Sequence, residues 1–417
     1  MSLETDVAAI LATARAAARK IALASTEQKN AALATLAEMI RKSKPLIMAA
    51  NRIDLERAHG ERRTGALVER LTLNDDRIEA IARGVDEVAA LPDPVGATID
   101  EWARPNGLKI EKRRVPIGLI AIIYESRPNV TVDAAALCLK SGNAVVLRGG
   151  KEAHASNGCL ADLVARALKE TGLDPAAAMF IENPDREIVQ ILKRSREALD
   201  LIIPRGGVQL KAALEGSTVP LLPHFEGICH TYVDAAADLK MAEKICFDAK
   251  CGRPSVCNAM ETLLVHRGAA ASFLPAFAAR MKKAGVELRG DEHVRALVRE
   301  ARAATPEDWD TEYWDLILSI KVVDSLDEAI AFIERHGSHL ADAIVTRDPA
   351  AAARFQHEVD SATVYVNAST RFTDGFEFGF GAETGISTNR LHARGPMGLA
   401  ELTTYKYVIH GSGQVRG

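Results

Sequence analysis

The sequence predicts an α/β protein of two domains, each with a parallel sheet that carries helices on its faces. Segments typical of strands and helices alternate from residue 117 onward, which is the order of a parallel sheet. The alternation runs through two cycles, with a boundary near residues 223–234. The 417 residues, 47% apolar and 26% charged, are ordinary values for a globular protein and provide material for two cores.

Composition and charge exclude several classes of protein. The 52 basic and 56 acidic side chains leave a net charge of −4, which argues against a nucleic-acid binder. The longest apolar run near the middle, 118–124, is far shorter than the roughly 20 residues of a membrane helix. No signal peptide precedes the first helix. We therefore expect a cytoplasmic protein with no membrane partner, whose six cysteines are reduced thiols.

The first hundred residues predict helices. Apolar side chains recur every three or four positions in 7–14 and 26–42, and Asn74 is placed to cap a helix over 75–88. These helices end at Pro92–Pro94. The alternating basic and apolar segment Lys109 to Val115 predicts an exposed strand.

The first α/β cycle begins with a strand at 119–124 and a helix at 131–141, which Gly142 ends as a left-handed residue. The remaining segments alternate in type. Strands are expected at 143–148, 179–182, 199–203 and 219–222, and helices at 156–171, 187–194 and 208–214.

The second cycle begins with a helix that Asp238 caps. Strands follow at 261–266, 316–323, 342–346 and 363–367, and helices at 269–283 and 326–336.

Cys257 is the strongest candidate for chemistry, because it lies in a loop between a predicted helix and a predicted strand. A thiol with an ordinary pKa of about 8.5 needs a nearby positive charge or a helix N-terminus to ionise at neutral pH. Lys250 and Arg253 are candidates for that charge. One alternative is a small buried core residue. Another is a metal site formed by Cys229, His230, Cys246, Cys251 and Cys257. The spacings of these residues match no zinc finger or ribbon.

Two glycine turns follow predicted strands. Arg148-Gly149-Gly150-Lys151 and Pro204-Arg205-Gly206-Gly207 let backbone N–H groups approach an anion, and their basic side chains add charge. Each motif alone is also typical of a plain turn. Together, at strand ends of one sheet, they indicate a dinucleotide phosphate site.

Three further side chains are candidates. Asn129 follows the strand at 119–124, where it could cap the next helix or donate to an oxyanion. Arg371 and Arg394 flank the glycine-rich segment 373–381, which is typical of a binding loop. These arginines could hold a carboxylate or phosphate, or be solvated surface charges.

At these residues the sequence resembles the γ-glutamyl phosphate reductase family, also called glutamate-5-semialdehyde dehydrogenases, of the aldehyde dehydrogenase superfamily. The resemblance implies an aldehyde dehydrogenase-like fold, with two Rossmann-like α/β domains and a small β oligomerisation element. It also implies NADPH-dependent reduction of L-glutamyl 5-phosphate to L-glutamate 5-semialdehyde in proline biosynthesis. The matching segments are 115–153, 201–207, 226–234, 253–266, 311–325 and 366–413.

The resemblance also implies roles for single residues. Cys257 matches the nucleophile that forms the thioester, and Asn129 stands near the oxyanion asparagine. Arg148 replaces the lysine that meets the adenosine ribose, and with Lys151 it suits a 2′-phosphate. Glu312 matches the glutamate that holds the nicotinamide ribose. Glu226 matches the deacylating base of the superfamily, although here phosphate rather than water exchanges with the acyl group.

The implied domains are an NADPH-binding domain of residues 1–103 and 117–226, a catalytic domain of 227–399, and an oligomerisation element of 104–116 and 400–417. The segments Lys109 to Val115 and Thr403 to His410 fit the strands of that element, and exposed strands need a partner edge. A homodimer or a dimer of dimers is expected.

Two other functions remain open at this point. The first is a general NAD(P)-dependent aldehyde dehydrogenase that releases the acid by hydrolysis. The second is a non-catalytic protein on the same fold that binds a metal or a partner.

Overall fold

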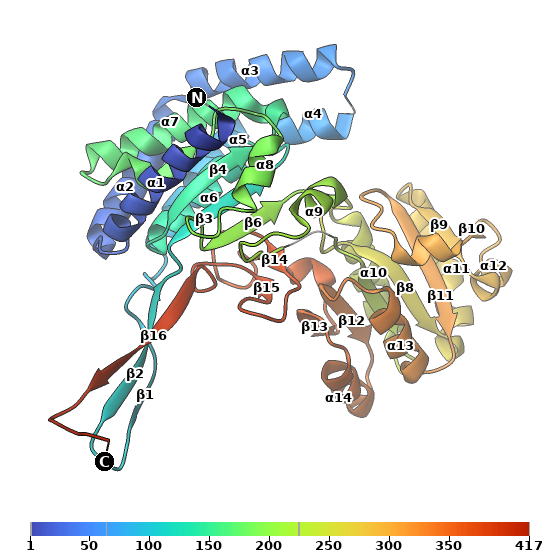
Figure 1. The fold of residues 1–417 in the computed structure, drawn as a ribbon. Coiled ribbons are helices and arrows are strands. Elements are labelled where there is room, and N and C mark those ends of the chain that lie inside the picture. The colour runs from blue at the N-terminus through green and yellow to red at the C-terminus, as the bar shows by residue number, and fades with distance from the viewer. Residues whose placement is uncertain (1, 64, 224–225, 417) are drawn as a thin grey trace. The chain divides into compact units, whose positions relative to one another are not determined.

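In the computed structural model, which describes residues 2–63, 65–223 and 226–416, the chain forms two units (Figure 1). Unit 1 comprises Met1–Phe225, Gly379–Gly385 and Met397–Gly417, and unit 2 comprises Glu226–Phe378 and Ile386–Pro396. The change of unit after residue 225 lies inside the boundary region that the alternation predicts. Within the described ranges, no helix combines the length and the apolar character that crossing a membrane requires.

The N-terminal helices form as their apolar periodicity predicts. The Ser25 side chain accepts from the Gln28 N–H in a capping box, and the Asn74 side chain accepts from the Arg77 N–H, which confirms the predicted cap. The helices are α1 (Leu3–Ile21), α2 (Thr26–Lys42), α3 (Lys44–Gly60), α4 (Gly65–Leu71) and α5 (Asp75–Ala90). Helices α1 and α5 each bury one apolar stripe, whereas α3 also buries Asn51 and Asp54.

Unit 1 contains a four-stranded parallel sheet in the order β5-β4-β3-β6. Gly142 and Gly172 adopt φ values of +75° and +77° just beyond helices α6 and α7, so the left-handed ending predicted for Gly142 is confirmed. The strands are β3 (Leu119–Tyr124), β4 (Ala144–Gly149), β5 (Ala178–Phe180) and β6 (Leu201–Arg205); the helices are α6 (Asn129–Lys140), α7 (His154–Glu170), α8 (Glu187–Leu192) and α9 (Val208–Leu214).

The strand expected at 219–222 is not formed. An isolated bridge joins Ile202 to Leu221, and two backbone hydrogen bonds accompany it. Pro220 lies inside this segment and Pro223 follows it, and neither has an N–H to donate to a ladder. The alternating pattern therefore yields an extended segment without a full strand.

A three-stranded antiparallel sheet completes unit 1, in the order β1-β2-β16 (Figure 1). Its strands are β1 (Thr98–Ala103), β2 (Lys109–Pro116) and β16 (Thr403–His410). The segments expected to be exposed strands both form, and β2 lies between the other two. The sequence prediction missed β1, because it assigned no element to the residues between Pro94 and Lys109.

Unit 2 contains a seven-stranded parallel sheet in the order β10-β9-β11-β8-β7-β12-β13. Helices α10, α11 and α12 contribute to the apolar core on one face, and α13 and α14 to the core on the other. The strands are β7 (Cys229–Val233), β8 (Met260–His266), β9 (Glu287–Gly290), β10 (Arg302–Ala303), β11 (Ile317–Val323), β12 (Ala341–Val345) and β13 (Thr363–Val366). The helices are α10 (Leu239–Cys251), α11 (Arg267–Lys283), α12 (Glu292–Leu297), α13 (Leu326–His336) and α14 (Pro349–Glu358).

The sequence prediction recovered most of unit 2 and missed some short elements. The Asp238 side chain accepts from the N–H groups of Lys240 and Met241, as its predicted cap requires. Strand β7 was not predicted, because its residues were interpreted as part of the domain boundary. Strands β9 and β10 and helices α12 and α14 were also missed, because they are short and few of their apolar side chains recur with a regular period. A two-stranded ladder, β14 (Ile386–Ser387) with β15 (Gly395–Pro396), completes the unit.

Candidate functional site

Cys257 lies in the loop that joins α10 to β8 in unit 2, as the sequence predicts. The Cys229 thiol donates to the Cys257 carbonyl oxygen at 3.3 Å. Gly227 approaches the same backbone so closely that a Cβ at Gly227 would lie 2.0 Å from that oxygen. The thiol is partly buried against the small cluster of Cys229, Leu340, Ala341 and Ile386. The loop that carries the candidate nucleophile is therefore packed on its backbone side by the start of β7.

The two cations expected to assist Cys257 have different surroundings. The Lys250 ammonium is fully buried and pairs with the Glu261 carboxylate at 2.5 Å, so its charge is already balanced. Lys250 therefore offers no unbalanced positive charge to stabilise the Cys257 thiolate. Arg253 is exposed. The structure therefore favours a role for Lys250 in holding the loop rather than in ionising the thiol directly.

The cysteines proposed as alternative metal ligands do not converge. Cys229 and Cys246 lie in different apolar clusters, and Cys251 contacts the Met281 sulfur at 3.9 Å. All six cysteines are free thiols. Among the residues that the structure describes, no group of three or more His, Cys, Asp or Glu side chains is arranged to hold a metal ion.

Asn258, the neighbour of Cys257, links the thiol loop to Arg371. Its side-chain NH₂ donates to the Thr373 carbonyl oxygen at 2.8 Å, and its side-chain oxygen accepts from Arg371. The Thr370 hydroxyl donates to the Asn258 carbonyl oxygen at 2.8 Å. The sequence prediction overlooked Asn258, although its position directly after the candidate nucleophile was a usable signal. The structure thus brings Arg371 to the residue beside Cys257.

Arg394 is held elsewhere in unit 2. Its guanidinium donates to the Asp360 carboxylate and to the Asp360 carbonyl oxygen, both at 2.6 Å. Arg390 also pairs with this carboxylate. The Arg394 Nε is buried without a hydrogen-bond partner. Arg394 is therefore engaged by a protein carboxylate, which weakens the expectation that it clamps a substrate.

Glu312 lies on the segment between β10 and β11, and burial raises the pKa of its carboxyl to about 8. The nearby charges of Glu261 and Glu226 raise the pKa further, whereas the Gly227 N–H lowers it. One Glu312 oxygen is buried with no partner. The same residue, Gly227, therefore faces both Glu312 and the Cys257 backbone. The sequence prediction named Glu312 but neither Gly227 nor Glu261.

The glycine turns of unit 1 lie at the carboxyl ends of β4 and β6, as the sequence predicts. A Cβ at Gly150 would lie 2.2 Å from the Glu152 carboxylate, and one at Gly206 would lie 2.8 Å from the carboxyl carbon of Glu125. The Glu152 carboxylate is held by the Ser126 N–H and hydroxyl at 2.7 and 3.0 Å. The carboxylates of Glu152 and Glu125 therefore occupy the space beside Gly150 and Gly206, whereas a Cβ at Gly207 would meet no atom within 4 Å.

Arg148 is largely buried at the end of β4. One guanidinium nitrogen donates to the carbonyl oxygens of Pro184 and Asp185 at 3.0 and 3.2 Å, and Nε is buried without a partner. Lys151 is exposed, and its carbonyl oxygen accepts from Arg57. Arg148 therefore orders the segment before α8 and still carries a donor that no protein group satisfies.

Asn129 is the first residue of α6, but it does not cap that helix. Pro128 occupies the cap position and no side chain caps the helix. The Asn129 NH₂ donates instead to the Asp133 carboxylate at 2.8 Å. Burial raises the pKa of Asp133 to about 6, and Asn129 lowers it. The cap alternative is therefore wrong, and the oxyanion role stays a prediction.

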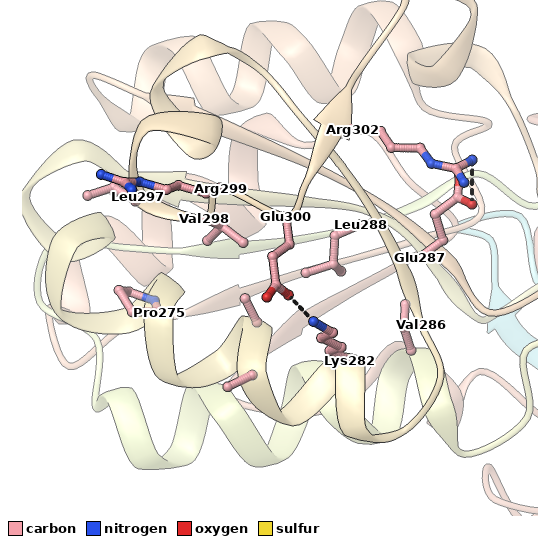
Figure 2. A pocket seen from close by; sticks show the side chains of 12 residues that line it. Pro275, Lys282, Val286, Glu287, Leu288, Leu297, Val298, Arg299, Glu300 and Arg302 are labelled. Carbon is pink, nitrogen blue, oxygen red and sulfur yellow. Dashed lines mark ion pairs between the residues drawn. The ribbon is translucent and has the colours of Figure 1, made fainter.

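A cavity of about 510 Å³ lies at the far edge of the unit 2 sheet, between α11, β9, α12 and β10 (Figure 2). Two ion pairs lie in its lining, Lys282 with Glu300 at 2.6 Å and Arg302 with Glu287 at 2.8 Å, and Arg299 is a further charged lining residue. It contains no residue that the sequence marks as functional.

Comparison with known proteins agrees with this arrangement. Residues 2–313 match the model of the aldehyde dehydrogenase family. A protein from Moorella thermoacetica named gamma-glutamyl phosphate reductase is 54% identical over 404 residues, covering 97% of each chain. One of the same name from Carboxydothermus hydrogenoformans is 55% identical, covering 97% of this chain and 98% of the relative.

Solved structures show the same relationship. The crystal structure of gamma-glutamyl phosphate reductase from Thermotoga maritima superposes with a TM-score of 0.95 at 48% identity, covering 98% of this chain and 99% of that one. An acetylating aldehyde dehydrogenase from Geobacillus thermoglucosidasius, 15% identical with a TM-score of 0.70, covers 99% of this chain and 98% of its own and shares the fold. The chain belongs to the aldehyde dehydrogenase family and, within it, to the gamma-glutamyl phosphate reductases. The predicted family and fold class are confirmed.

Proposed function

We propose that this oxidoreductase reduces L-glutamyl 5-phosphate to L-glutamate 5-semialdehyde and phosphate, in proline biosynthesis. Relatives more than 50% identical over nearly the whole chain carry the name gamma-glutamyl phosphate reductase. The structural observation that carries the proposal is the placement of Cys257, in a loop that Gly227 and Cys229 pack from behind and that Asn258 ties to Arg371.

Cys257 is the proposed nucleophile. Its thiolate attacks the carbonyl carbon of the acyl phosphate, the bond to the phosphate oxygen breaks, and phosphate leaves with the electron pair, so that a thioester remains on Cys257. Asn129 is the proposed donor to the oxyanion of this step. Reduction of the thioester gives a thiohemiacetal, which releases the aldehyde and restores the thiolate. Arg371 and Arg394 are the proposed ligands of the anionic groups of the substrate, with Arg371 favoured by its contact with Asn258.

Members of the aldehyde dehydrogenase family use a nicotinamide cofactor, which supplies the hydride when bound. The glycine turns of unit 1 fit the phosphates of such a cofactor, because they follow the carboxyl ends of β4 and β6 and Arg148, Lys151 and Arg205 add positive charge there. We assign Arg148, Lys151, Arg205, Gly206 and Gly207 to its phosphates and adenosine, and Glu312 to the nicotinamide ribose. The positive charges of Arg148 and of the exposed Lys151 support NADPH rather than NADH, because a 2′-phosphate adds negative charge.

The decisive assay is the reverse reaction: NADP⁺ reduction by glutamate semialdehyde with and without inorganic phosphate. The proposal expects strict dependence on phosphate or arsenate, a lower kcat/KM with NAD⁺, and loss of turnover in Cys257→Ser with retained binding of 2′,5′-ADP. Phosphate-independent oxidation would instead establish the hydrolytic aldehyde dehydrogenase. Bound zinc together with a Cys257 that resists alkylation would favour a non-catalytic protein.

We further propose that the chain forms a homodimer, or a dimer of dimers, through the sheet β1-β2-β16. One face of this sheet exposes Tyr405, Tyr407 and Ile409, which are 48%, 53% and 58% accessible. Trp102 packs edge-on against Tyr407, with ring centroids 6.1 Å apart. Strand β16 is an edge of the sheet, and an exposed edge of this kind is typical of pairing with another chain.

A further inference from the structure

Lys250 and Glu261 bracket the loop that carries Cys257. Lys250 is in the last turn of α10 and Glu261 is the second residue of β8, and their side chains meet at 2.5 Å with accessibilities of 0% and 1%. The alternate positions of β8 that follow Glu261, Leu263 and Val265, belong to the apolar core. The pair therefore places two charges, instead of two apolar side chains in contact, where the thiol loop joins α10 and β8.

Stability alone does not explain a buried ion pair at this position. Burying two charges costs desolvation that their attraction offsets only in part, and apolar replacements of similar volume are often neutral or stabilising. One Glu261 oxygen remains buried without a hydrogen-bond partner, which adds to the cost. The pair is therefore weak evidence for a contribution to stability, and its position beside the thiol loop favours another role.

The same pair faces the segment that carries Glu312. Burial raises the pKa of the Glu261 carboxyl to about 7, whereas the Lys250 ammonium and the backbone N–H groups of Tyr313 and Trp314 lower it. The Lys250 ammonium lies 5.7 Å from the centroid of the Tyr313 ring. Trp314 has a φ of +57°, a left-handed conformation that a bulky side chain adopts only when its surroundings hold it. The charges of Lys250 and Glu261 thus order the residues directly after Glu312.

We propose that the Lys250–Glu261 ion pair is a positioning element, which fixes the thiol loop and the Glu312 segment relative to each other. The inference rests on the proposed role of Glu312 at the nicotinamide ribose. By this account, Lys250 and Glu261 touch neither substrate nor cofactor. They keep Glu312 at a fixed position relative to Cys257. Their loss should therefore weaken binding of the nicotinamide half of the cofactor and leave binding of the adenosine half unchanged.

The test replaces the pair by apolar side chains, in the variant Lys250→Met/Glu261→Leu. We expect the dissociation constant for NADPH to rise at least 5-fold and kcat to fall at least 10-fold. The dissociation constant for 2′,5′-ADP, which lacks the nicotinamide half, should stay within 2-fold of the wild type. Unchanged NADPH affinity, or equal losses for both ligands, would show that the pair does not act on the nicotinamide end.

A matched control is the buried pair Lys29–Asp93 of unit 1, also at 2.5 Å, with accessibilities of 1% and 9%. Lys29→Met/Asp93→Leu should leave the ratio of the two dissociation constants unchanged. If Lys250→Met/Glu261→Leu does not fold, Glu261→Asp provides the same test, because it keeps the charge and shortens its reach. The expected rise in the NADPH dissociation constant is then 2- to 5-fold, and no rise contradicts the proposal.

A mutant cycle with Glu312→Gln identifies the route of the effect. If the pair acts through Glu312, adding Lys250→Met/Glu261→Leu to Glu312→Gln should weaken NADPH binding by less than 2-fold beyond Glu312→Gln alone. If the fold-losses in NADPH affinity of the two variants multiply in full, the proposal is overturned. Because both readouts are binding constants, they distinguish this inference from the proposed reaction, which fails separately if phosphate-dependent turnover is absent.

Discussion

Gly227 and Cys257 are in backbone contact: a Cβ on Gly227 would lie 2.0 Å from the Cys257 carbonyl oxygen and 2.7 Å from its Cα. Backbone atoms cannot yield as a flexible side-chain end does, so this contact requires a residue without a Cβ. Gly227, two residues before the start of β7, therefore sets how closely the chain approaches the thiol loop. Gly227 also faces Glu312, whose pKa its N–H lowers.

Gly227→Ala should therefore damage the thiol loop. We expect kcat to fall at least 100-fold, because the added methyl must displace the backbone of Cys257, and a 1 Å misplacement at a reacting group is already costly. Steady-state kinetics and the rate of Cys257 alkylation measure the effect. Gly158→Ala is the control, since a Cβ there meets no atom within 4 Å and helix α7 gains a better helix former. Wild-type kinetics in Gly227→Ala would contradict this account.

The two arginines predicted at the substrate should differ in effect. Arg371→Ala is expected to lower kcat/KM at least 100-fold and also to lower the melting temperature, because this guanidinium is a partner of the buried Asn258 side-chain oxygen beside the proposed nucleophile. Arg394→Ala should mainly lower the melting temperature, since it leaves Asp360 with one fewer partner. Steady-state kinetics and thermal unfolding of both variants separate the roles. A larger loss of kcat/KM in Arg394→Ala would reverse the assignment.

Stability should depend on pH through Glu312. Its pKa is about 8 in the folded protein against 4.5 in the unfolded chain, so the folded state holds a proton that the unfolded state releases between these values. The wild type should therefore lose stability as pH rises from 5 to 8. Glu312→Gln removes this loss, and its free energy of unfolding should gain roughly 1 kcal/mol or more over the wild type across that range.

Urea unfolding at pH 5, 6.5 and 8 measures this difference. Glu111→Gln is the control, because a hydrogen bond from Arg113 lowers the pKa of Glu111 to about 2 and its titration is complete below pH 5. The stability difference between Glu111→Gln and the wild type should be constant over the same range. A constant difference for Glu312→Gln as well would show that its carboxyl is ionised throughout.

Assembly should depend on the exposed face of β16. Tyr407→Asp/Ile409→Asp places two charges in the proposed interface and should reduce the mass measured by light scattering to that of one chain. Leu23→Asp is the control, because Leu23 is 87% accessible at the end of α1 in unit 1. This variant should leave the mass unchanged. A wild-type mass for Tyr407→Asp/Ile409→Asp would place the interface elsewhere.

The sequence predicted the fold well where local patterns are strong. Apolar periodicity located the long helices, and helix α9 forms over Val208–Leu214 as expected. The isolated Leu221 bridge and the unpredicted strand β1 show the limit. Strand formation needs a partner with free N–H and C=O groups in register, and neighbours along the chain do not reveal that partner.

The chemical candidates were determined by the sequence itself: Cys257 in a loop between a helix and a strand, two glycine turns at strand ends, and the motifs of the family. The partners of these residues were decided by the tertiary structure alone. Lys250 pairs with Glu261, Arg394 with Asp360, and Gly227 packs against Cys257. These contacts join segments that only the sheet order of unit 2 brings together. A charge or a glycine acquires its role from its partner in space, so the sequence provided the candidate reacting groups while the fold decided how each is held.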